Sequence, residues 1–376
     1  MRNMRKIKKF LKIYKTTAVI VLNVIILFII ANIFLEIMIV KFKDVSRTPL
    51  TYGMETLKRV YPDLSEAEIK DMVLGSWDVE FEYEPFTQFT TVQSGKYVNI
   101  DENGFRIVEN QCKYPINDNN YNIFVFGGST GFGVGVADKD TIPSNMQSKL
   151  RKYHSKVCIF NFGRTMYFSS QERALLEVLI LRNQVPDMAI FIDGINDFLF
   201  AGSDPAVTKL LNDVVSGKNK LGIVLSYLPI TRVYTFFDPF RQKLQSKSEK
   251  ELKETIQRYL TNKRIIDAIG KEYNIKTYFV IQPTPTYKYN LSNHIIFQEN
   301  PDIFDIHVDS FLGYNVLEKH YHNLKGGDKR NIIWLADMQI DKNENLYVDA
   351  VHYNANFSEE IAGEIVNIIK YDVINK

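Results

Sequence analysis

The sequence predicts an α/β domain with a parallel sheet between two layers of helices, preceded by one transmembrane helix. From residue 121 onward, short apolar segments alternate with amphipathic helical segments and glycine-containing loops. This alternation is typical of a parallel sheet with helices on both faces. Nearer the amino terminus, residues 18–40 are almost wholly apolar and would rise about 34 Å as a helix, which spans a bilayer.

Composition and charge exclude some classes of protein. The 376 residues are 45% hydrophobic and 24% charged, as in globular proteins. The first fifteen residues hold seven Lys or Arg and no acid, so a net charge of +2 for the chain leaves −5 for the rest. Nucleic-acid binding begins with a basic face, which a net acidic body does not favour. We therefore expect no nucleic-acid partner.

The basic stretch also predicts an orientation in the membrane. Residues 1–16 form a cytoplasmic basic tail and residues 17–40 the transmembrane helix, because Lys and Arg are retained on the cytoplasmic side. No Ala-x-Ala-like cleavage site follows the apolar run, which favours an uncleaved anchor over a signal peptide. We expect a single-pass protein of the cytoplasmic (inner) membrane, with everything after about residue 41 outside the cytoplasm.

The chain has two cysteines, Cys112 and Cys158, too few for a disulfide framework or a multi-thiolate metal site. Cys158 lies in an apolar segment, where a small buried thiol is the simpler interpretation. A Cys112–Cys158 bridge in an oxidising compartment remains an open alternative.

Residues 41–117 are predicted to be a linker and an N-terminal extension. Ser65 and Glu68 have the spacing of a capping box and predict a helix over 65–74. Short strands or an extended arm should follow, ending at Asn103-Gly104, a hairpin signal. The extension is rich in aromatic residues, namely Trp77, Phe81, Tyr83, Phe86, Phe89 and Tyr97.

The main domain is predicted over residues 118–376. Its expected strands are 122–126, 157–162, 188–193, 276–282 and 332–335, and its expected helices are 141–153, 171–183, 249–273 and 358–371. An insertion over 201–247 carries several aromatic residues, which either pack as core and lid or line a substrate groove. These residues are Tyr227, Tyr234, Phe236, Phe237 and Phe240.

Ser129 stands where a nucleophile is expected, in a glycine-rich loop (127–133) after the first strand. Such glycines let the backbone turn tightly, and the start of a helix favours negative charge. The loop does not match the dinucleotide fingerprint and lacks the lysine of a phosphate loop. It does fit the G-x-S-x-G elbow of α/β-hydrolases, although in that fold the serine usually follows a later strand.

An Asp and a His near the carboxyl end supply the partners of a nucleophile. Asp349 precedes His352 by three residues, so one loop can present the carboxylate to the imidazole. The carboxylate would orient the imidazole and stabilise its cation once it takes a proton from Ser129.

Two further loops distinguish between the scaffolds. The second strand ends in Asn161-Phe162-Gly163-Arg164, and the third ends in Asp193-Gly194-Ile195-Asn196-Asp197. Together with Ser129 and the Asp349/His352 pair, these blocks resemble the SGNH/GDSL hydrolase family over about residues 118–376. The family often has Gly-Asp-Ser in the first block, where this chain has Gly128 before the serine. Residues 97–106 also resemble the lead-in of membrane-anchored members from bacterial cell-envelope systems.

The resemblance implies a flavodoxin-like α/β/α fold and a role for each residue. Ser129 is the nucleophile, His352 the general base and Asp349 its orienting residue. The N–H groups of Ser129 and Gly163 and the amide of Asn196 form the oxyanion hole. It implies an esterase that removes O-acetyl groups from an extracytoplasmic envelope glycan, without a cofactor.

Alternatives to this function are an O-acetyltransferase with a membrane acyl-donor partner and a non-catalytic glycan-binding subunit. Polysaccharide-assembly proteins are possible partners in either case. Arg106, Arg164 and Asp197 are candidates for substrate binding. We expect no metal, because His320 and His322 are two residues apart and do not share a helix face.

Overall fold

The computed structural model describes residues 2–46, 49–199, 204–205, 208–217, 220–231 and 246–375. The chain forms two compact units, one of Met1–Arg47 with Lys209–Gln242 and the other of Thr48–Thr208 with Lys243–Lys376. Part of the predicted insertion therefore groups with the N-terminal helix.

The first unit is built on α1 (Arg2–Ser46), in which Met4–Ile39 is long and apolar enough to cross a membrane. It also contains most of α8 (Thr208–Val215) and α9 (Lys220–Ser226). Tyr227 is 70% exposed, so it packs in no core within the part that the structure describes. The other four aromatic residues predicted for the insertion lie outside the described residues.

The second unit contains the predicted parallel sheet, and all five expected strands are present. They are β3 (Tyr121–Gly127), β4 (Val157–Asn161), β5 (Met188–Asp193), β6 (Lys276–Ile281) and β7 (Ile332–Trp334). The order is β4-β3-β5-β6-β7, and every pairing is parallel. In this flavodoxin-like order, β4 and β5 lie on opposite sides of β3. Sheets of this kind bind ligands at that point, beyond the carboxyl ends of the strands.

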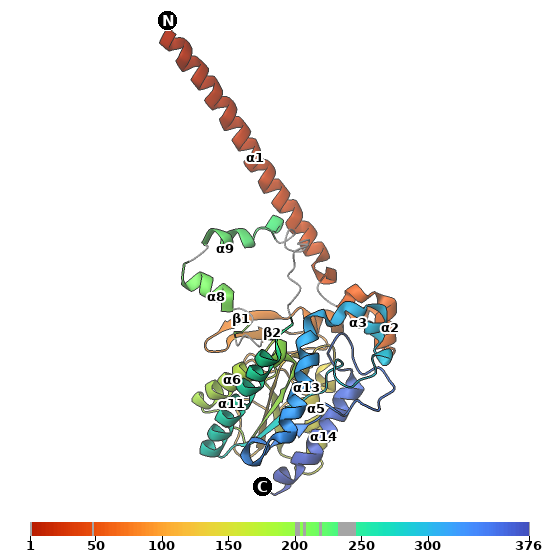
Figure 1. Ribbon diagram of the computed structural model, residues 1–376. Coiled ribbons are helices and arrows are strands. Elements are labelled where there is room, and N and C mark those ends of the chain that lie inside the picture. The colour runs from red at the N-terminus through yellow and green to blue at the C-terminus, as the bar shows by residue number, and fades with distance from the viewer. Residues whose placement is uncertain are drawn as a thin grey trace. The chain divides into compact units, whose positions relative to one another are not determined.

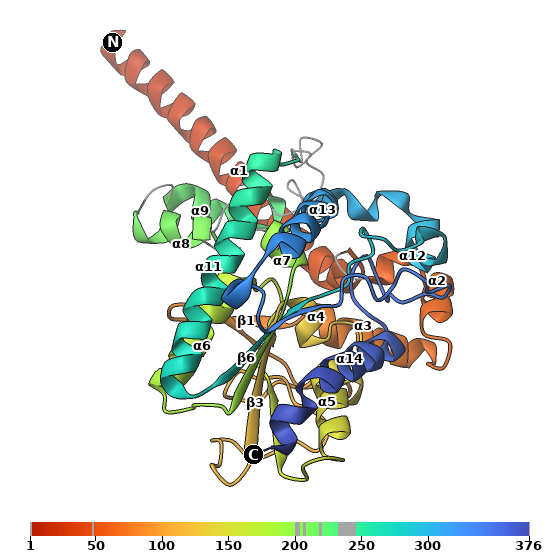
Figure 2. The same cartoon turned by 60° about the horizontal axis from the view of Figure 1, so that its bottom comes forward.

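Helices cover both faces of the sheet, as predicted (Figures 1 and 2). On one face, α5 (Ile142–Leu150) and α14 (Ala355–Ile374) pack on aliphatic residues such as Ile123 and Ile190. On the other face, α6 (Ser169–Leu181) and α11 (Glu249–Tyr273) pack on aromatic residues such as Phe126 and Phe191. The strands are buried on both sides, which explains their continuous apolar sequences.

The N-terminal extension begins with η1 (Pro49–Tyr52), α2 (Met54–Val60) and α3 (Glu66–Trp77), followed by a hairpin of β1 (Glu80–Glu84) and β2 (Gln88–Val92). Ser65 and Glu68 form the predicted capping box of α3. At Asn103-Gly104 the chain makes a tight turn closed by the bridge between Ile100 and Arg106.

Several short elements of this unit were not predicted. They are α4 (Ser129–Phe132), η2 (Asp138–Asp140), α7 (Ile195–Leu199), η3 (Leu291–Asn293), α12 (Ile295–Glu299), η4 (Pro301–His307) and η5 (Gly326–Asp328). The longer α13 (Val308–Asn323) was also missed, and it packs through Tyr314 and Leu317 on α11.

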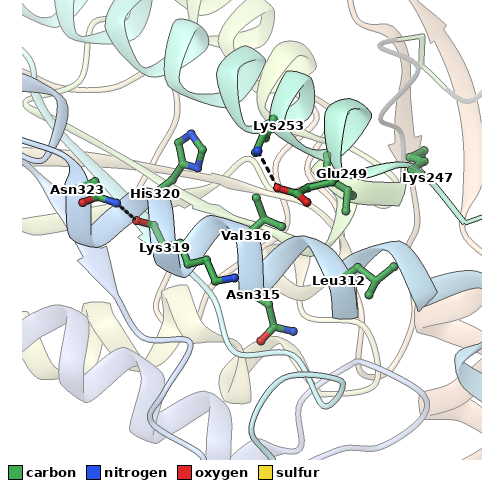
Figure 3. Close-up of a pocket in the computed structure, with 10 residues that line it drawn as sticks. Lys247, Glu249, Lys253, Leu312, Asn315, Val316, Lys319, His320 and Asn323 are labelled. Atoms are coloured by element: carbon green, nitrogen blue, oxygen red, sulfur yellow. Dashed lines mark hydrogen bonds and ion pairs between the residues drawn. The ribbon is translucent and has the colours of Figure 1, made fainter.

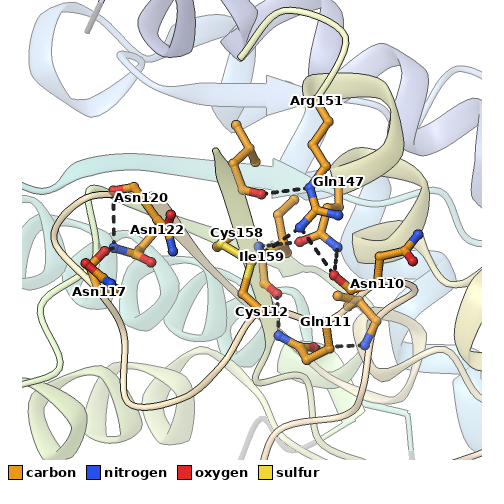
Figure 4. The surroundings of a disulfide bond; sticks show 12 residues. Asn110, Gln111, Cys112, Asn117, Asn120, Asn122, Gln147, Arg151, Cys158 and Ile159 are labelled. Carbon is orange, nitrogen blue, oxygen red and sulfur yellow. Dashed lines mark hydrogen bonds between the residues drawn. A yellow bond between two sulfur atoms is a disulfide. The ribbon is translucent and has the colours of Figure 1, made fainter. Parts of the chain in front are cut away.

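Cys112 and Cys158 form a disulfide, so the simpler interpretation of Cys158 as a free thiol is wrong (Figure 4). Residues 110–112 lie beside β4, because Gln111 donates a hydrogen bond to the carbonyl of Ile159. Gln147 of α5 donates to the carbonyl of Glu109 and accepts from the N–H of Ile159. These contacts bring Cys112 within bridging distance of Cys158, with 5.7 Å between their Cα atoms.

Candidate active site

Ser129 begins α4 immediately after β3, as predicted. Gly128 is the N-cap of this short helix, and Gly133 ends it in the left-handed conformation, with φ of +92°. A first-turn N–H has no partner within its helix, so the N–H of Ser129 is placed to stabilise negative charge. Thr130 attaches the helix to the end of β6 by donating a 2.6 Å hydrogen bond to the side chain of Gln282.

Asp349 and His352 lie on a tight turn closed by the bridge between Tyr347 and Tyr353. The N–H of Val348 donates to the carbonyl of His352 across this turn. One oxygen of Asp349 accepts hydrogen bonds from the N–H groups of Val351 and His352, at 2.9 and 3.0 Å. The turn thus fixes the carboxylate and the imidazole against each other.

The three residues form a continuous hydrogen-bonded relay. His352 Nε2 is 2.7 Å from Ser129 Oγ, and Nδ1 is 2.8 Å from each oxygen of Asp349. Asp349 is 1% exposed and His352 is 4% exposed. Burial opposes the charge of Asp349, but nearby His352 and the hydrogen bonds outweigh it and hold the pKa of Asp349 below its ordinary value. The carboxylate therefore stays ionised and can orient the imidazole.

Asn196 lies beside the nucleophile, as predicted for an oxyanion-hole residue. Its Nδ2 donates a 2.7 Å hydrogen bond to the carbonyl of Tyr167, which leaves the second amide hydrogen for a ligand. A Cβ atom added to Gly128 would lie only 2.2 Å from this nitrogen. The glycine that replaces the more usual Asp before Ser129 therefore makes room for the Asn196 amide.

Gly163 differs from its predicted role. Its N–H donates a 3.0 Å hydrogen bond to Asn161 Oδ1, so the donor assigned to the oxyanion hole is occupied. A Cβ atom at this position would lie 2.4 Å from the backbone nitrogen of Phe132. In this structure the missing side chain serves the close packing of the β4 loop on α4.

The three residues predicted to bind substrate are buried in structural contacts instead, and this corrects the prediction. Arg106 is 1% exposed, forms an ion pair with Asp138, and donates to the carbonyls of Phe132, Gly133 and Val136. It therefore holds the loop that follows α4.

Arg164 is also 1% exposed and forms an ion pair with Glu84 of the N-terminal hairpin. It donates to the hydroxyl of Tyr167, which in turn donates to the carbonyl of Phe89. These contacts attach the hairpin to the loop after β4.

Asp197 is 3% exposed, accepts from Ser169 and pairs with Arg258. It lies beside two other buried carboxyl groups, Glu172 and Asp193. Burial, followed by the neighbouring carboxylates, raises the pKa of Glu172 and of Asp193 well above their ordinary values. This acidic cluster supports α7, which carries Asn196.

Two aromatic neighbours of the triad were not predicted. Trp77 of α3 meets the imidazole of His352 edge to face, with ring centroids 5.1 Å apart. His307 is buried, and its Nδ1 has no hydrogen-bond partner among the described residues. Burial and then the charge of His352 lower the pKa of His307 to about 4, so this second imidazole is neutral. Nothing in sequence spacing connects either residue to His352.

Two grooves lie near the surface of this unit. One, of about 590 Å³, runs from α2 and α3 to the start of α14; its walls include Tyr61, Tyr97, Asn345, Asn354 and Asn356. The other, of about 530 Å³, lies between α11 and α13 (Figure 3). Neither groove is lined by a triad residue. His320 lines this second groove, and within the described ranges no group of three His, Cys, Asp or Glu side chains could hold a metal ion.

No family model and no curated protein matches the sequence. Among solved structures, an acetyl xylan esterase is 14% identical with a TM-score of 0.37, and the match covers 66% of this chain and 99% of that one. A structure described as a lipolytic protein of the G-D-S-L family from Desulfitobacterium hafniense is 9% identical, with a TM-score of 0.36 and coverages of 66% and 99%. A lipase from a goat rumen metagenome is 14% identical, with a TM-score of 0.41 and coverages of 66% and 97%.

The site residues follow the order of the strands. A serine follows the first strand of a five-stranded parallel sheet, an asparagine follows the third, and an Asp-x-x-His turn completes the relay at 2.7 Å. This order of residues along the sheet is the one expected from the resemblance of the sequence to SGNH/GDSL hydrolases.

Proposed function

We propose that this protein is a membrane-anchored serine esterase that removes O-acetyl groups from a glycan outside the cytoplasm. The observation that carries the proposal is the Ser129–His352–Asp349 relay, because each of its contacts has the length that proton transfer needs.

The residues act in two steps. Ser129 Oγ attacks the ester carbonyl carbon while His352 Nε2 takes its proton, and the oxyanion is stabilised by the N–H of Ser129 and the amide of Asn196. Collapse breaks the bond to the sugar oxygen, which receives the proton from His352, and leaves an acetyl group on Ser129. A water molecule, deprotonated by His352, then releases acetate and restores the serine.

A glycan as substrate is supported by two surfaces of the main unit. The groove beside α14 offers amide groups and tyrosine rings, which suit sugar hydroxyls and sugar faces. The β1–β2 hairpin exposes Phe81, Tyr83 and Phe86 next to Glu80 and Glu82. Phe81 and Tyr83 share one face of β1 and Glu80 and Glu82 the other, and exposed aromatic rings can stack on the faces of sugars.

The extracytoplasmic location is supported by two independent features. The basic residues before the apolar run of α1 favour a cytoplasmic amino terminus. The disulfide between Cys112 and Cys158 favours an oxidising compartment for the main domain.

Turnover of p-nitrophenyl acetate and of acetylated polysaccharides tests the esterase. A soluble fragment beginning at residue 49 should release acetate from both. Ser129→Ala should reduce kcat by at least about 10³-fold, because it removes the nucleophile. Equal turnover by the two proteins would refute the assignment and leave a non-catalytic glycan-binding role.

The acetyl-enzyme can also pass its acetyl group to a sugar hydroxyl, which would make the protein an O-acetyltransferase. Deleting the gene separates the two reactions. A rise in the O-acetyl content of envelope polysaccharide indicates the proposed hydrolysis, whereas a fall indicates transfer and contradicts it.

A further inference from the structure

Asn32 is a polar residue inside the apolar span of α1. The structure describes the side chains of residues 4–39 in this helix, and Asn32 alone among them is buried, at 8% exposed. Leu35, Glu36, Met38 and Ile39 are partly covered, whereas residues 4–31 are all exposed. Something therefore covers α1 from Asn32 toward its carboxyl end.

Part of the cover comes from the residues that follow α9, which belong to the same compact unit. The N–H of Ile230, just after α9, donates a 3.2 Å hydrogen bond to Asn32 Oδ1. Asn32 Nδ2 donates in turn to the carbonyl of Phe28, at 2.9 Å. A polar side chain within a membrane helix is costly unless it is paired, and these two bonds satisfy both ends of the amide.

The depth of this contact follows from helix geometry. With a rise of 1.5 Å per residue, Asn32 lies about 12 Å before the end of the apolar run at Val40. The carboxyl-terminal end of the run belongs to the outer leaflet in the orientation proposed above. A backbone group bonded to Asn32 must then lie below the headgroups, at about the depth that interfacial helices reach.

The two short helices carry apolar side chains that the protein does not cover. Leu210 and Val214 are one helical turn apart on α8 and are 46% and 55% exposed, but α8 starts at Thr208, which belongs to the main unit and accepts a 2.8 Å hydrogen bond from Gln88 of β2. Leu221 and Val224 are similarly related on α9 and are 70% and 63% exposed.

We propose that residues 220–231 are inserted into the outer leaflet of the bilayer beside α1, with the apolar face of α9 against lipid. The occupant of this face is lipid because Ile230, four residues beyond α9, contacts Asn32 within the hydrocarbon region. Lys220, at the start of the segment, carries the positive charge that anionic headgroups attract. The proposal rests on the membrane anchoring by α1.

Depth-dependent fluorescence quenching tests it with the full-length protein in vesicles of phosphatidylethanolamine and phosphatidylglycerol. Both native cysteines are in the disulfide, so an introduced cysteine is the unique site for an environment-sensitive NBD label. Val224→Cys reports on the apolar face, and Asn212→Cys on α8, outside the inserted segment, is its matched control. Ile25→Cys reports on the anchor.

Shallow doxyl lipids should quench the label at Val224 at least about threefold more than the label at Asn212, because interfacial helices bury their apolar face and Asn212 lies outside the inserted segment. Asn32→Leu should weaken the quenching at Val224 and leave Ile25 unchanged. Turnover of p-nitrophenyl acetate confirms that each variant is folded.

Other outcomes overturn the proposal. Equal quenching of Val224 and Asn212 by aqueous iodide would show that the apolar face of α9 meets water. Protection of Val224 from both iodide and doxyl lipid would show that a protein, either a second copy or a partner, covers it. If doxyl lipid does not quench the label at Ile25, membrane anchoring by α1 is refuted. If it quenches the label at Ile25 but not at Val224, only the insertion of the segment is refuted.

Discussion

Asp349 and His352 are three residues apart and share one closed turn, whereas Ser129 and Asn196 come from loops after different strands. Within the turn, Asp349 accepts its hydrogen bonds from Val351 and His352, and Tyr353 attaches the turn to the carbonyl of Pro283. The nucleophile side depends on distant segments, including the N-terminal hairpin that pairs with Arg164. The base half is thus a local structure, and the oxyanion half is a product of the tertiary fold.

The largest effect should come from breaking the local half. Asp349→Asn should lower kcat about ten-thousand-fold with little change in KM, because the amide favours the wrong imidazole tautomer. Steady-state kinetics on p-nitrophenyl acetate measures it, with Ser129→Ala as the baseline. A loss under tenfold would mean that the turn alone orients His352.

The next effect concerns the oxyanion side. Asn196→Ala should reduce kcat by about 10²–10³-fold by removing a donor to the oxyanion. Gly128→Ala should cause a comparable loss while keeping the amide, because the new Cβ would lie 2.2 Å from Asn196 Nδ2 and displace it. Unchanged kinetics in both variants would mean that the Asn196 amide is not part of the oxyanion hole.

The support of the oxyanion side can be tested through stability. Arg164→Leu should lower the free energy of unfolding by about 3 kcal/mol, because it leaves the partly buried Glu84 carboxylate without its partner. Arg59→Ala, which breaks an exposed pair with Glu299, should cost less than about 1 kcal/mol. Urea unfolding of the soluble fragment gives both values, and equal costs would contradict a clamping role for the hairpin.

The smallest effect depends on pH. The pKa of Glu172 is raised in the folded state, first by burial and then by Asp193, so its protonated form favours folding. This contribution is complete at low pH and is lost as the pH rises through the raised pKa. Glu172→Gln should therefore raise Tm by about 2–4 °C at alkaline pH and have little effect near pH 4.

Thermal unfolding across this pH range measures the effect. Glu177→Gln, on the exposed side of the same helix, is the control and should show no such trend. A stabilisation that does not change with pH would mean that Glu172 does not titrate as its burial implies.

The parallel sheet could be predicted because its strands are continuous apolar segments separated by helical patterns. The helix α13 escaped prediction because its apolar residues do not form one stripe: Tyr314 is buried on α11, while Phe311 is half exposed. The pattern of apolar residues in a sequence predicts a helix only when one face of that helix is buried along its whole length.

The triad was predictable for a similar reason, since Ser129, Asp349 and His352 occupy positions set by strand ends and short spacing. The functions of Arg106 and Arg164 were not, because a buried arginine and a substrate-binding arginine look alike in sequence. Trp77 meets His352 across more than 270 residues of chain, and sequence spacing holds no information on such a contact.

The disulfide has a consequence for the order in which the protein matures. The loop that it closes contains β3, Ser129 and α5, and Cys158 precedes His352 by about half of the chain. If the main domain is exported as proposed above, its amino end crosses the membrane first, so an oxidant can form the disulfide in the nucleophile segment before the general base has crossed. Export would then deliver a covalently closed but inactive half-site, which gains activity only when the last helix arrives.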